Sequence, residues 1–254
     1  MLVLFTDFGF QGPYVGQMKA VLHGRAPGIP VVDLMHDAPP FDPQSSAYLL
    51  AALTGYLAPG SVVLAVVDPG VGTDRRALVV EADGRWLICP DNGLFALTVR
   101  RARAARAWEI TWRPDKLSAS FHGRDLFAPV AAEIAAGGSF AGLPKGREIA
   151  LQEVDRPEWP DEFERIVYVD GFGNAISGIR AENLSPNHRI VVHNVEIKGE
   201  KTFASVPPDT LFWYANSSGL VEIACNRGRA DRRLGLSVGT GVRVVGNQSV
   251  TGVT

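Results

Sequence analysis

The chain has 254 residues, which is enough to bury a substantial core in one large domain or two modest ones. A hydrophobic content of 46%, a charged content of 20% and a net charge of -2 are typical of a soluble globular protein and argue against nucleic-acid binding by phosphate neutralisation. No apolar run approaches the ~20 residues of a membrane helix, and the N-terminus lacks the basic segment of a signal peptide. No membrane association and a cytoplasmic location are therefore expected.

The first 67 residues alternate between short apolar runs and amphipathic segments. The apolar runs predict strands at residues 2–5, 29–34 and 61–67. Helices are predicted from Pro13 to about Gly24 and from Pro43 onward, because proline is favoured in the first helical turn. This alternation is typical of a mostly parallel, helix-covered sheet, so an α/β, Rossmann-like domain is expected.

The pattern changes along the next hundred residues. Two apolar runs at residues 77–81 and 85–89 flank Asp83-Gly84, which predicts a hairpin. A helical segment at 94–103, a strand at 107–110 and an alanine-rich helix that begins near His122 and ends at Gly137-Gly138 follow.

A proline-containing linker is predicted at residues 156–162, between an α/β domain at 1–155 and a second domain at 163–254. The second domain lacks a helical period of useful length, and its short apolar runs are separated by glycine and proline turns. It is therefore predicted to be a small all-β barrel or sandwich. Its strands are expected at residues 165–169, 175–179, 189–197, 211–216, 220–225 and 242–245.

Polar side chains follow the predicted strands of the first domain at the ends where parallel sheets bind ligands. Asp7 follows the first strand, and Asp68 follows the third and precedes a glycine-rich loop with Arg75. His122 lies between an aromatic residue and a glycine at a predicted helix start. An Asp, an Arg and a His that converge on a cleft could position and polarise a water molecule. For any one of these four residues taken alone, a structural role is the more common one.

The chain lacks the sequence patterns of several common cofactor and metal sites. It contains no P-loop, no dinucleotide fingerprint and no cysteine pair of the zinc-binding kind. Cys89 and Cys225 lie in apolar segments and are predicted to be buried free thiols. No metal and no cofactor are therefore expected.

Six ordered motifs that cover nearly the whole chain closely resemble the S-adenosyl-L-methionine hydroxide adenosyltransferases, which are relatives of the fluorinase and chlorinase enzymes. The motifs are Thr6-Asp7-Phe8-Gly9, Val67-Asp68-Pro69-Gly70-Val71-Gly72-Thr73 followed by Arg75-Arg76, Pro90-Asp91-Asn92-Gly93, Phe121-His122-Gly123-Arg124-Asp125-Leu126-Phe127-Ala128-Pro129, Asp170-Gly171-Phe172-Gly173-Asn174 and Asn216-Ser217-Ser218-Gly219.

The resemblance implies attack of water or hydroxide on the C5′ carbon of S-adenosyl-L-methionine (SAM), which releases adenosine and L-methionine. It implies that Asp68, Arg75 and His122 surround the attacking water, and the motif leaves Arg76 as an alternative to Arg75. SAM is then the substrate and no cofactor is required, because the sulfonium leaves as a neutral thioether.

The resemblance also implies a substrate pocket shared between subunits of a homotrimer, with the N-terminal domain of one subunit facing the C-terminal domain of the next. The implied substrate-binding residues are Asp7, Phe8, Phe41, Asp170, Phe172, Asn174, Ser217, Asn226 and Arg227. Both Gly173-Asn174 and Ser217-Ser218-Gly219 are also ordinary turn sequences, so a purely structural role is an alternative for them.

Two other functions stay open. The first is halide transfer to SAM; the resemblance implies tyrosines in the halogenases at the positions of Asp68 and His122, and a serine at that of Gly123. A carboxylate beside the nucleophile would repel a halide and assist a water, so charge disfavours this alternative. The second is binding of SAM or adenosine without turnover.

Overall fold

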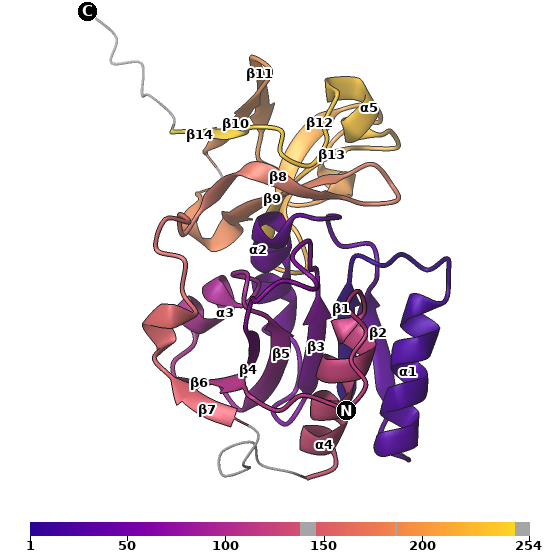
Figure 1. Ribbon diagram of the computed structural model, residues 1–254. Helices are drawn as coiled ribbons and strands as arrows, with labels where there is room; N and C mark the ends of the chain where they lie inside the picture. Colours follow the sequence, from indigo (N-terminus) through magenta and orange to yellow (C-terminus); the bar gives the residue numbers. More distant parts are fainter. Residues whose placement is uncertain (138–145, 186, 247–254) are drawn as a thin grey trace, which may run out of the picture. The chain divides into compact units, whose positions relative to one another are not determined.

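The computed structural model describes residues 1–137, 146–185 and 187–246 (Figure 1). It divides into two compact units, Met1–Glu158 and Trp159–Thr254. The boundary between the units falls inside the segment 156–162, where the sequence changes character. Each unit has a hydrophobic core of its own, which includes Leu4 in the first unit and Ile223 in the second.

A seven-stranded mixed sheet forms the centre of the first unit, in the order β2-β1-β3-β5-β4-β6-β7 (Figure 1). Strands β2, β1, β3 and β5 run parallel, whereas β4, β6 and β7 continue the sheet in antiparallel pairs. The strands are β1 (Leu2–Thr6), β2 (Val31–Met35), β3 (Val62–Val66), β4 (Ala77–Ala82), β5 (Arg85–Pro90), β6 (Ala105–Ile110) and β7 (Gly146–Ile149).

Helices cover both faces of this sheet. The helices are α1 (Tyr14–Arg25), α2 (Pro43–Thr54), α3 (Ala96–Arg101) and α4 (Ala128–Ala135), and a short 3-10 turn spans Leu151–Glu153. Helices α1 and α4 pack against the face that carries Leu2, Leu4 and Leu64. The residues between them, Val3 and Val63, are equally inaccessible, so the β-branched and apolar runs are explained by burial on both sides.

Local signals in the sequence explain where the elements begin and turn. Asp42 caps α2, because its Oδ1 accepts a hydrogen bond from the Ser45 backbone N–H at 2.9 Å. Asp83 and Gly84 both have positive φ, 46° and 75°, as the tight turn of the β4–β5 hairpin requires. The predicted hairpin is confirmed.

The helix predicted after His122 is interrupted. Residues Gly123–Phe127 form a π-helical turn, and only then does α4 begin. The Phe127 N-cap and the proline in the first turn of α4 mark the change. Of the predicted end at Gly137-Gly138, Gly137 lies two residues past α4, and Gly138 lies outside the described residues.

Two antiparallel sheets make up the second unit, one with the order β12-β13-β9-β8 and one with the order β11-β10-β14. The strands are β8 (Phe163–Val169), β9 (Ala175–Arg180), β10 (Arg189–Val192), β11 (Val195–Lys198), β12 (Leu211–Ala215), β13 (Leu220–Cys225) and β14 (Arg243–Val245), with α5 (Ala230–Leu234) and 3-10 turns at Ala181–Asn183 and Phe203–Ser205. An α/β domain followed by a small β domain confirms the predicted fold class.

One strand prediction in this unit is wrong. Residues 189–197 were expected to form a single strand, but they form the hairpin β10–β11, whose turn is His193-Asn194. Both turn residues have positive φ, 48° and 64°. Asn194 is a residue that turns favour, but with no glycine or proline beside it the apolar run resembles one continuous strand. Within the described part of the chain, no helix is long and apolar enough to cross a membrane.

Candidate active site

Two carboxylates meet at one edge of the first sheet because their strands are parallel neighbours in register. Strand β1 pairs with β3 so that Thr6 lies opposite Val66. Asp7 and Asp68 follow these residues closely, at the carboxyl ends where open α/β sheets place their ligand sites. The two carboxylates are close enough for their charges to interact. Burial raises the pKa of Asp7, and the negative charge of Asp68 raises it further.

The structure brings Asp68, Arg75 and His122 together, as the sequence predicts. The guanidinium of Arg75 donates to both carboxylate oxygens of Asp68, from Nε to Oδ1 at 2.7 Å and from Nη2 to Oδ2. The same Nη2 lies 3.3 Å from Nδ1 of His122. The side chains of Asp68 and Arg75 are only 5% and 9% exposed, so this ion pair is shielded from solvent.

His122 is set up to be a neutral ring. Burial, and secondly the neighbouring Arg75 guanidinium, lower the pKa of His122 below its ordinary value. Because arginine can only donate, Nδ1 of His122 accepts the hydrogen bond and the ring proton lies on Nε2. The ring can therefore donate from Nε2 to a ligand atom.

Arg76 belongs to a different network. Its guanidinium pairs with Asp91 and Glu153, each at 2.7 Å, and these contacts raise the pKa of Arg76. Of the two arginines that the sequence left as alternatives, Arg75 is the one that contacts Asp68 and His122.

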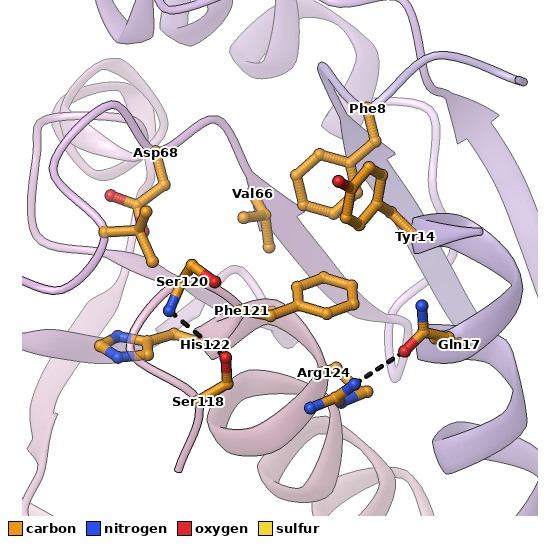
Figure 2. Close-up of a pocket in the computed structure, with 12 residues that line it drawn as sticks. Phe8, Tyr14, Gln17, Val66, Asp68, Ser118, Ser120, Phe121, His122 and Arg124 are labelled. Atoms are coloured by element: carbon orange, nitrogen blue, oxygen red, sulfur yellow. Dashed lines mark hydrogen bonds between the residues drawn. The ribbon is translucent and has the colours of Figure 1, made fainter. Parts of the chain in front are cut away.

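A pocket of about 420 Å³ opens beside this cluster (Figure 2). Asp68 and His122 line one side of it, and the aromatic rings of Phe8, Tyr14 and Phe121 lie on the other. These three rings contact each other edge-on or tilted, with centroids 5.4 to 5.9 Å apart. The pocket thus offers a charged wall and an apolar, aromatic wall.

A chain of hydrogen bonds fixes the loop that carries Asp7. Thr6 Oγ1 contacts Nδ1 of the buried His36 at 2.8 Å, and Nε2 of His36 contacts Asp33 Oδ1 at 3.0 Å. Lys19 donates to the other oxygen of Asp33 at 2.9 Å. Asp7 itself accepts from the Phe41 backbone N–H at 3.1 Å, which leaves its carboxylate tied to the next loop and outside the pocket lining.

The second unit contains a larger pocket, of about 780 Å³. Five of the residues expected to bind substrate line it: Asp170, Phe172, Asn174, Ser217 and Arg227. Asp170 also organises the β8–β9 turn, because it accepts from the backbone N–H groups of Phe172 and Asn174, both at 2.9 Å. Structural and binding roles are thus compatible for this carboxylate.

Besides Asp7, two expected residues lie outside the two pocket linings. The side-chain amide of Asn226 donates to the Val206 carbonyl at 2.7 Å, and Asn226 does not line the pocket. Phe41 has a positive φ of 58° and is 78% exposed, so within one chain it lines neither pocket.

Sequence reasoning missed several pocket residues. Tyr14 and Gln17 on α1 line the first pocket, and only their helical spacing could have indicated it. Tyr214 and Glu222 line the second. Glu222 had a visible signal, since it is the one acidic residue in the otherwise apolar strand Leu220–Cys225.

The described residues contain no group of three or more His, Cys, Asp or Glu side chains arranged to hold a metal ion. The polar groups that line the first pocket are the carboxylate of Asp68, the neutral imidazole of His122, the guanidinium of Arg124, the amide of Gln17, and the hydroxyls of Tyr14, Ser118 and Ser120.

An α/β unit with a buried Asp–Arg–His cluster at its strand ends, joined to an antiparallel β unit with a second polar pocket, defines a two-domain class of enzyme that acts on small molecules. The chain belongs to the SAM hydroxide adenosyltransferase family. The model of that family's N-terminal domain matches residues 2–144, and the model of its C-terminal domain matches residues 164–243.

Known proteins are similar to this chain over most of its length. The (R)-S-adenosyl-L-methionine hydrolase of Thermus thermophilus is 41% identical over 94% of this chain and 97% of its own length. A crystal structure of an uncharacterized conserved protein from Thermotoga maritima superimposes with a TM-score of 0.80 at 29% identity, and covers 96% of this chain and 99% of its own. A fluorinase of Actinopolyspora mzabensis is more distant, at 24% identity over 96% of both chains.

Proposed function

We propose that this protein hydrolyses S-adenosyl-L-methionine by attack of water on C5′, giving adenosine and L-methionine. The observation that carries the proposal is the shielded Asp68–Arg75 ion pair next to His122 at a pocket with an aromatic wall, in a chain whose similar relatives are named SAM hydrolases. Hydrolysis at C5′ requires a positioned water molecule and no acid for the leaving group, because the thioether leaves as a neutral molecule. The polar groups of this cluster can position such a water.

The chemistry fits these side chains. The water oxygen forms the new bond to C5′ while the C5′–S bond breaks. The electron pair of the broken bond stays on sulfur, which becomes the neutral thioether of methionine. The water loses one proton on the way to the 5′-hydroxyl. Asp68 is the group that accepts it or holds it, because the Nε2 of His122 already carries a hydrogen.

Arg75 keeps Asp68 and His122 in position, and its positive charge favours the hydroxide character that the water gains as its proton is removed. It contacts both residues from one guanidinium, and it stacks over the Phe127 ring at 5.5 Å. A group held by three contacts needs little reorganisation during the reaction.

The experiment is a turnover in ¹⁸O-labelled water. Hydrolysis at C5′ puts the label into the 5′-hydroxyl of adenosine, and the methionine stays unlabelled. Adenosine without label would refute attack by water, and no loss of SAM over hours with tight binding would favour a binding protein instead.

Halide transfer is the alternative enzyme activity. The lower sequence identity to a fluorinase and the buried negative charge of Asp68 both disfavour halide transfer. Incubation with chloride or fluoride should give no 5′-halo-nucleoside, and formation of one would overturn this ranking.

The substrate site is proposed to join the two pockets through assembly of a homotrimer, as the family resemblance implies. Phe41 and Phe172 support this proposal, because two aromatic rings assigned to the nucleoside pocket are 78% and 80% exposed in the single chain. Sedimentation should give a trimer. A mixture of inactive His122→Ala and inactive Asp170→Ala subunits should regain activity, since some sites then combine two intact pockets.

No cofactor is proposed, because the thioether needs no Lewis acid to leave. Activity should survive dialysis against a chelator.

A cytoplasmic location is also proposed, and the two buried, unpaired thiols of Cys89 and Cys225 suit a reducing compartment.

A further inference from the structure

The turn Pro90-Asp91-Asn92-Gly93 follows strand β5 directly and has no part in the chemistry proposed above. The side chain of Asn92 contacts the end of the neighbouring strand, because its Nδ2 donates to the Val67 carbonyl at 2.8 Å. Its Oδ1 accepts from the Leu94 backbone N–H at 3.3 Å, so both halves of the amide are bonded and its orientation is defined. Val67 is buried and directly precedes Asp68.

Asn92 extends the pairing of the parallel strands β3 and β5 beyond their backbone ladder. At the start of β5 the backbone N–H of Trp86 donates to the Ser61 carbonyl at 2.9 Å. Alternate residues of a strand direct their N–H groups to the same side, so Pro90, which has no N–H, interrupts the ladder on the side of β3. Asn92 lies two residues further on, and its separation from Val67 is 25 residues, as in the first pair. Its side chain therefore supplies the donor that a regular strand would supply from its backbone.

The adjacent residue of the turn holds the other end of the loop between Asp68 and Arg75. The backbone N–H of Asp91 donates to the Arg76 carbonyl at 3.0 Å. Nη1 of Arg75 donates to the same carbonyl at 3.4 Å. Two adjacent turn residues thus fix both ends of the segment that must bend back on itself to form the ion pair. Less conformational freedom is then lost when the two charged side chains meet.

Of these two contacts, only the one from Asn92 depends on a side chain. Without its amide, the buried Val67 carbonyl would lose its donor, and an unpaired buried carbonyl is costly enough to move the backbone toward another partner. A movement of Val67 passes directly to Asp68, the next residue. A displacement of about 1 Å in a reacting group can cost a large part of the rate.

We propose that Asn92 is a positioning residue for the reaction: by holding Val67, it places the Asp68–Arg75 pair where the attacking water is bound. The kinetic consequences rest on the proposed function. The placement of Arg75 against His122 does not, because it can be measured without turnover.

The pKa of His122 reports that placement. Burial is the main cause that lowers this pKa, followed by the charge of Arg75 and, more weakly, that of Arg113, whereas Asp68 and Asp125 raise it. A loop that moves away from the ring exposes it and weakens the contact with Arg75. The pKa of His122 should then rise toward its ordinary value of 6.5.

The kinetic test compares Asn92→Ala with Arg85→Ala. Arg85 lies at the other end of β5, and its Nε donates to the distant Leu57 carbonyl at 2.7 Å, so its loss is a matched loss of a bond from a side chain to the backbone. Asn92→Ala should lower kcat about 10-fold or more and keep the affinity for S-adenosyl-L-homocysteine, measured by calorimetry, within about threefold. Arg85→Ala should lower the Tm and keep kcat within about twofold. Equal losses of kcat in the two variants, or none in Asn92→Ala, overturn the proposal.

An NMR titration of the histidine rings separates this proposal from the proposed function. In Asn92→Ala the pKa of His122 should rise, and in Arg85→Ala it should stay in place; His122→Asn identifies the resonance among the five histidines. A rise in a protein that does not hydrolyse SAM would refute the proposed function and support the placement of the loop by Asn92. An unchanged pKa in Asn92→Ala overturns the positioning role, whatever the activity.

Asn92→Asp covers the case in which Asn92→Ala does not fold. The introduced carboxyl has the shape of the amide, but only its protonated form has an O–H that can donate to the Val67 carbonyl. The kcat of this variant, divided by that of the wild type at the same pH, should therefore rise as the pH falls through the pKa of the introduced carboxyl. A ratio that does not change with pH overturns the proposal.

Discussion

Arg75 and Asp68 form a two-pronged ion pair in which one guanidinium meets both carboxylate oxygens, with Nε 2.7 Å from Oδ1. The two residues are seven positions apart in one loop, and both are buried. A paired, buried carboxylate has fixed orientation as well as fixed charge. The ion pair therefore stabilises the loop and also fixes the carboxylate that is proposed to act on the attacking water.

Removing Arg75 should therefore damage both properties. Arg75→Ala is expected to lower kcat by about 10²- to 10³-fold, as loss of a preorganised charge does, and to destabilise the fold by about 3 to 5 kcal/mol because Asp68 is left buried and unpaired. Steady-state kinetics and thermal unfolding measure the two effects. Arg76→Ala is the matched control: it should lower the Tm and keep kcat within a few-fold, since Arg76 pairs with Asp91 and Glu153. Equal kinetic losses in both variants would contradict the assignment.

Asp68→Asn tests the carboxylate without changing its shape. The rate of SAM hydrolysis should fall about 10²-fold or more, because an amide neither accepts a proton from water nor orients it as strongly. Binding of adenosine should be kept. Asp91→Asn removes a carboxylate of similar burial that serves Arg76, and it should affect the Tm more than the rate. An unchanged rate in Asp68→Asn would remove this residue from the mechanism.

His122 gives a prediction for pH. Its pKa is lowered from 6.5, so the ring is neutral at pH 7 and kcat should stay level until the pH falls below this value. Protonation would end its acceptance of the Arg75 hydrogen bond. The free energy of unfolding should also fall with falling pH. His122 binds a proton more readily in the unfolded chain than in the folded one, so the stability contributed by the neutral ring is lost as the pH falls below about 6.5. Rate profiles of the wild type and His122→Asn measure this, and an acid limb of kcat that persists in the variant would assign it elsewhere.

Gly72 should tolerate no side chain. Its φ is +83°, and a Cβ there would lie 2.6 Å from the Ala119 carbonyl oxygen. Gly72→Ala is expected to cost about 1 to 3 kcal/mol of stability and to reduce kcat, because the loop must move away from the segment before His122. Gly70→Ala is the control, since its Cβ would meet nothing closer than Thr73 Oγ1 at 3.6 Å. Similar melting temperatures for the two variants would refute the explanation.

Much of the fold followed from the sequence because burial on both faces leaves an unmistakable apolar run, as in β1 and β3. The hairpin of β10 and β11 could not be predicted in this way. Its turn residues His193 and Asn194 adopt positive φ, and no glycine marks the turn in the sequence. The π-helical turn at Gly123–Phe127 was also hidden, because its composition is that of any helix start.

The candidate site was only partly visible in the sequence. Asp68 and Arg75 share a loop, but His122 comes from 47 residues beyond Arg75, and no periodicity connects them. The family resemblance supplied that connection, and in the structure Arg75 contacts Asp68 and His122 whereas Arg76 contacts Asp91 and Glu153. Glu222 could be seen as an anomaly, yet its hydrogen bonds with Tyr214 and Asn216 depend on strand pairing that the sequence does not give.

The different partners of Arg75 and Arg76 also fix the register between their loop and strand β4, which begins at Ala77. One arginine reaches Asp68 while its neighbour reaches Asp91 and Glu153. An insertion or deletion of one residue between Arg76 and Ala77 would shift both arginines relative to the strand and break both sets of ion pairs at once. Thr73 restricts the loop as well, because its Oγ1 donates to the Gly70 carbonyl at 2.7 Å and accepts from the Arg75 backbone N–H at 3.4 Å.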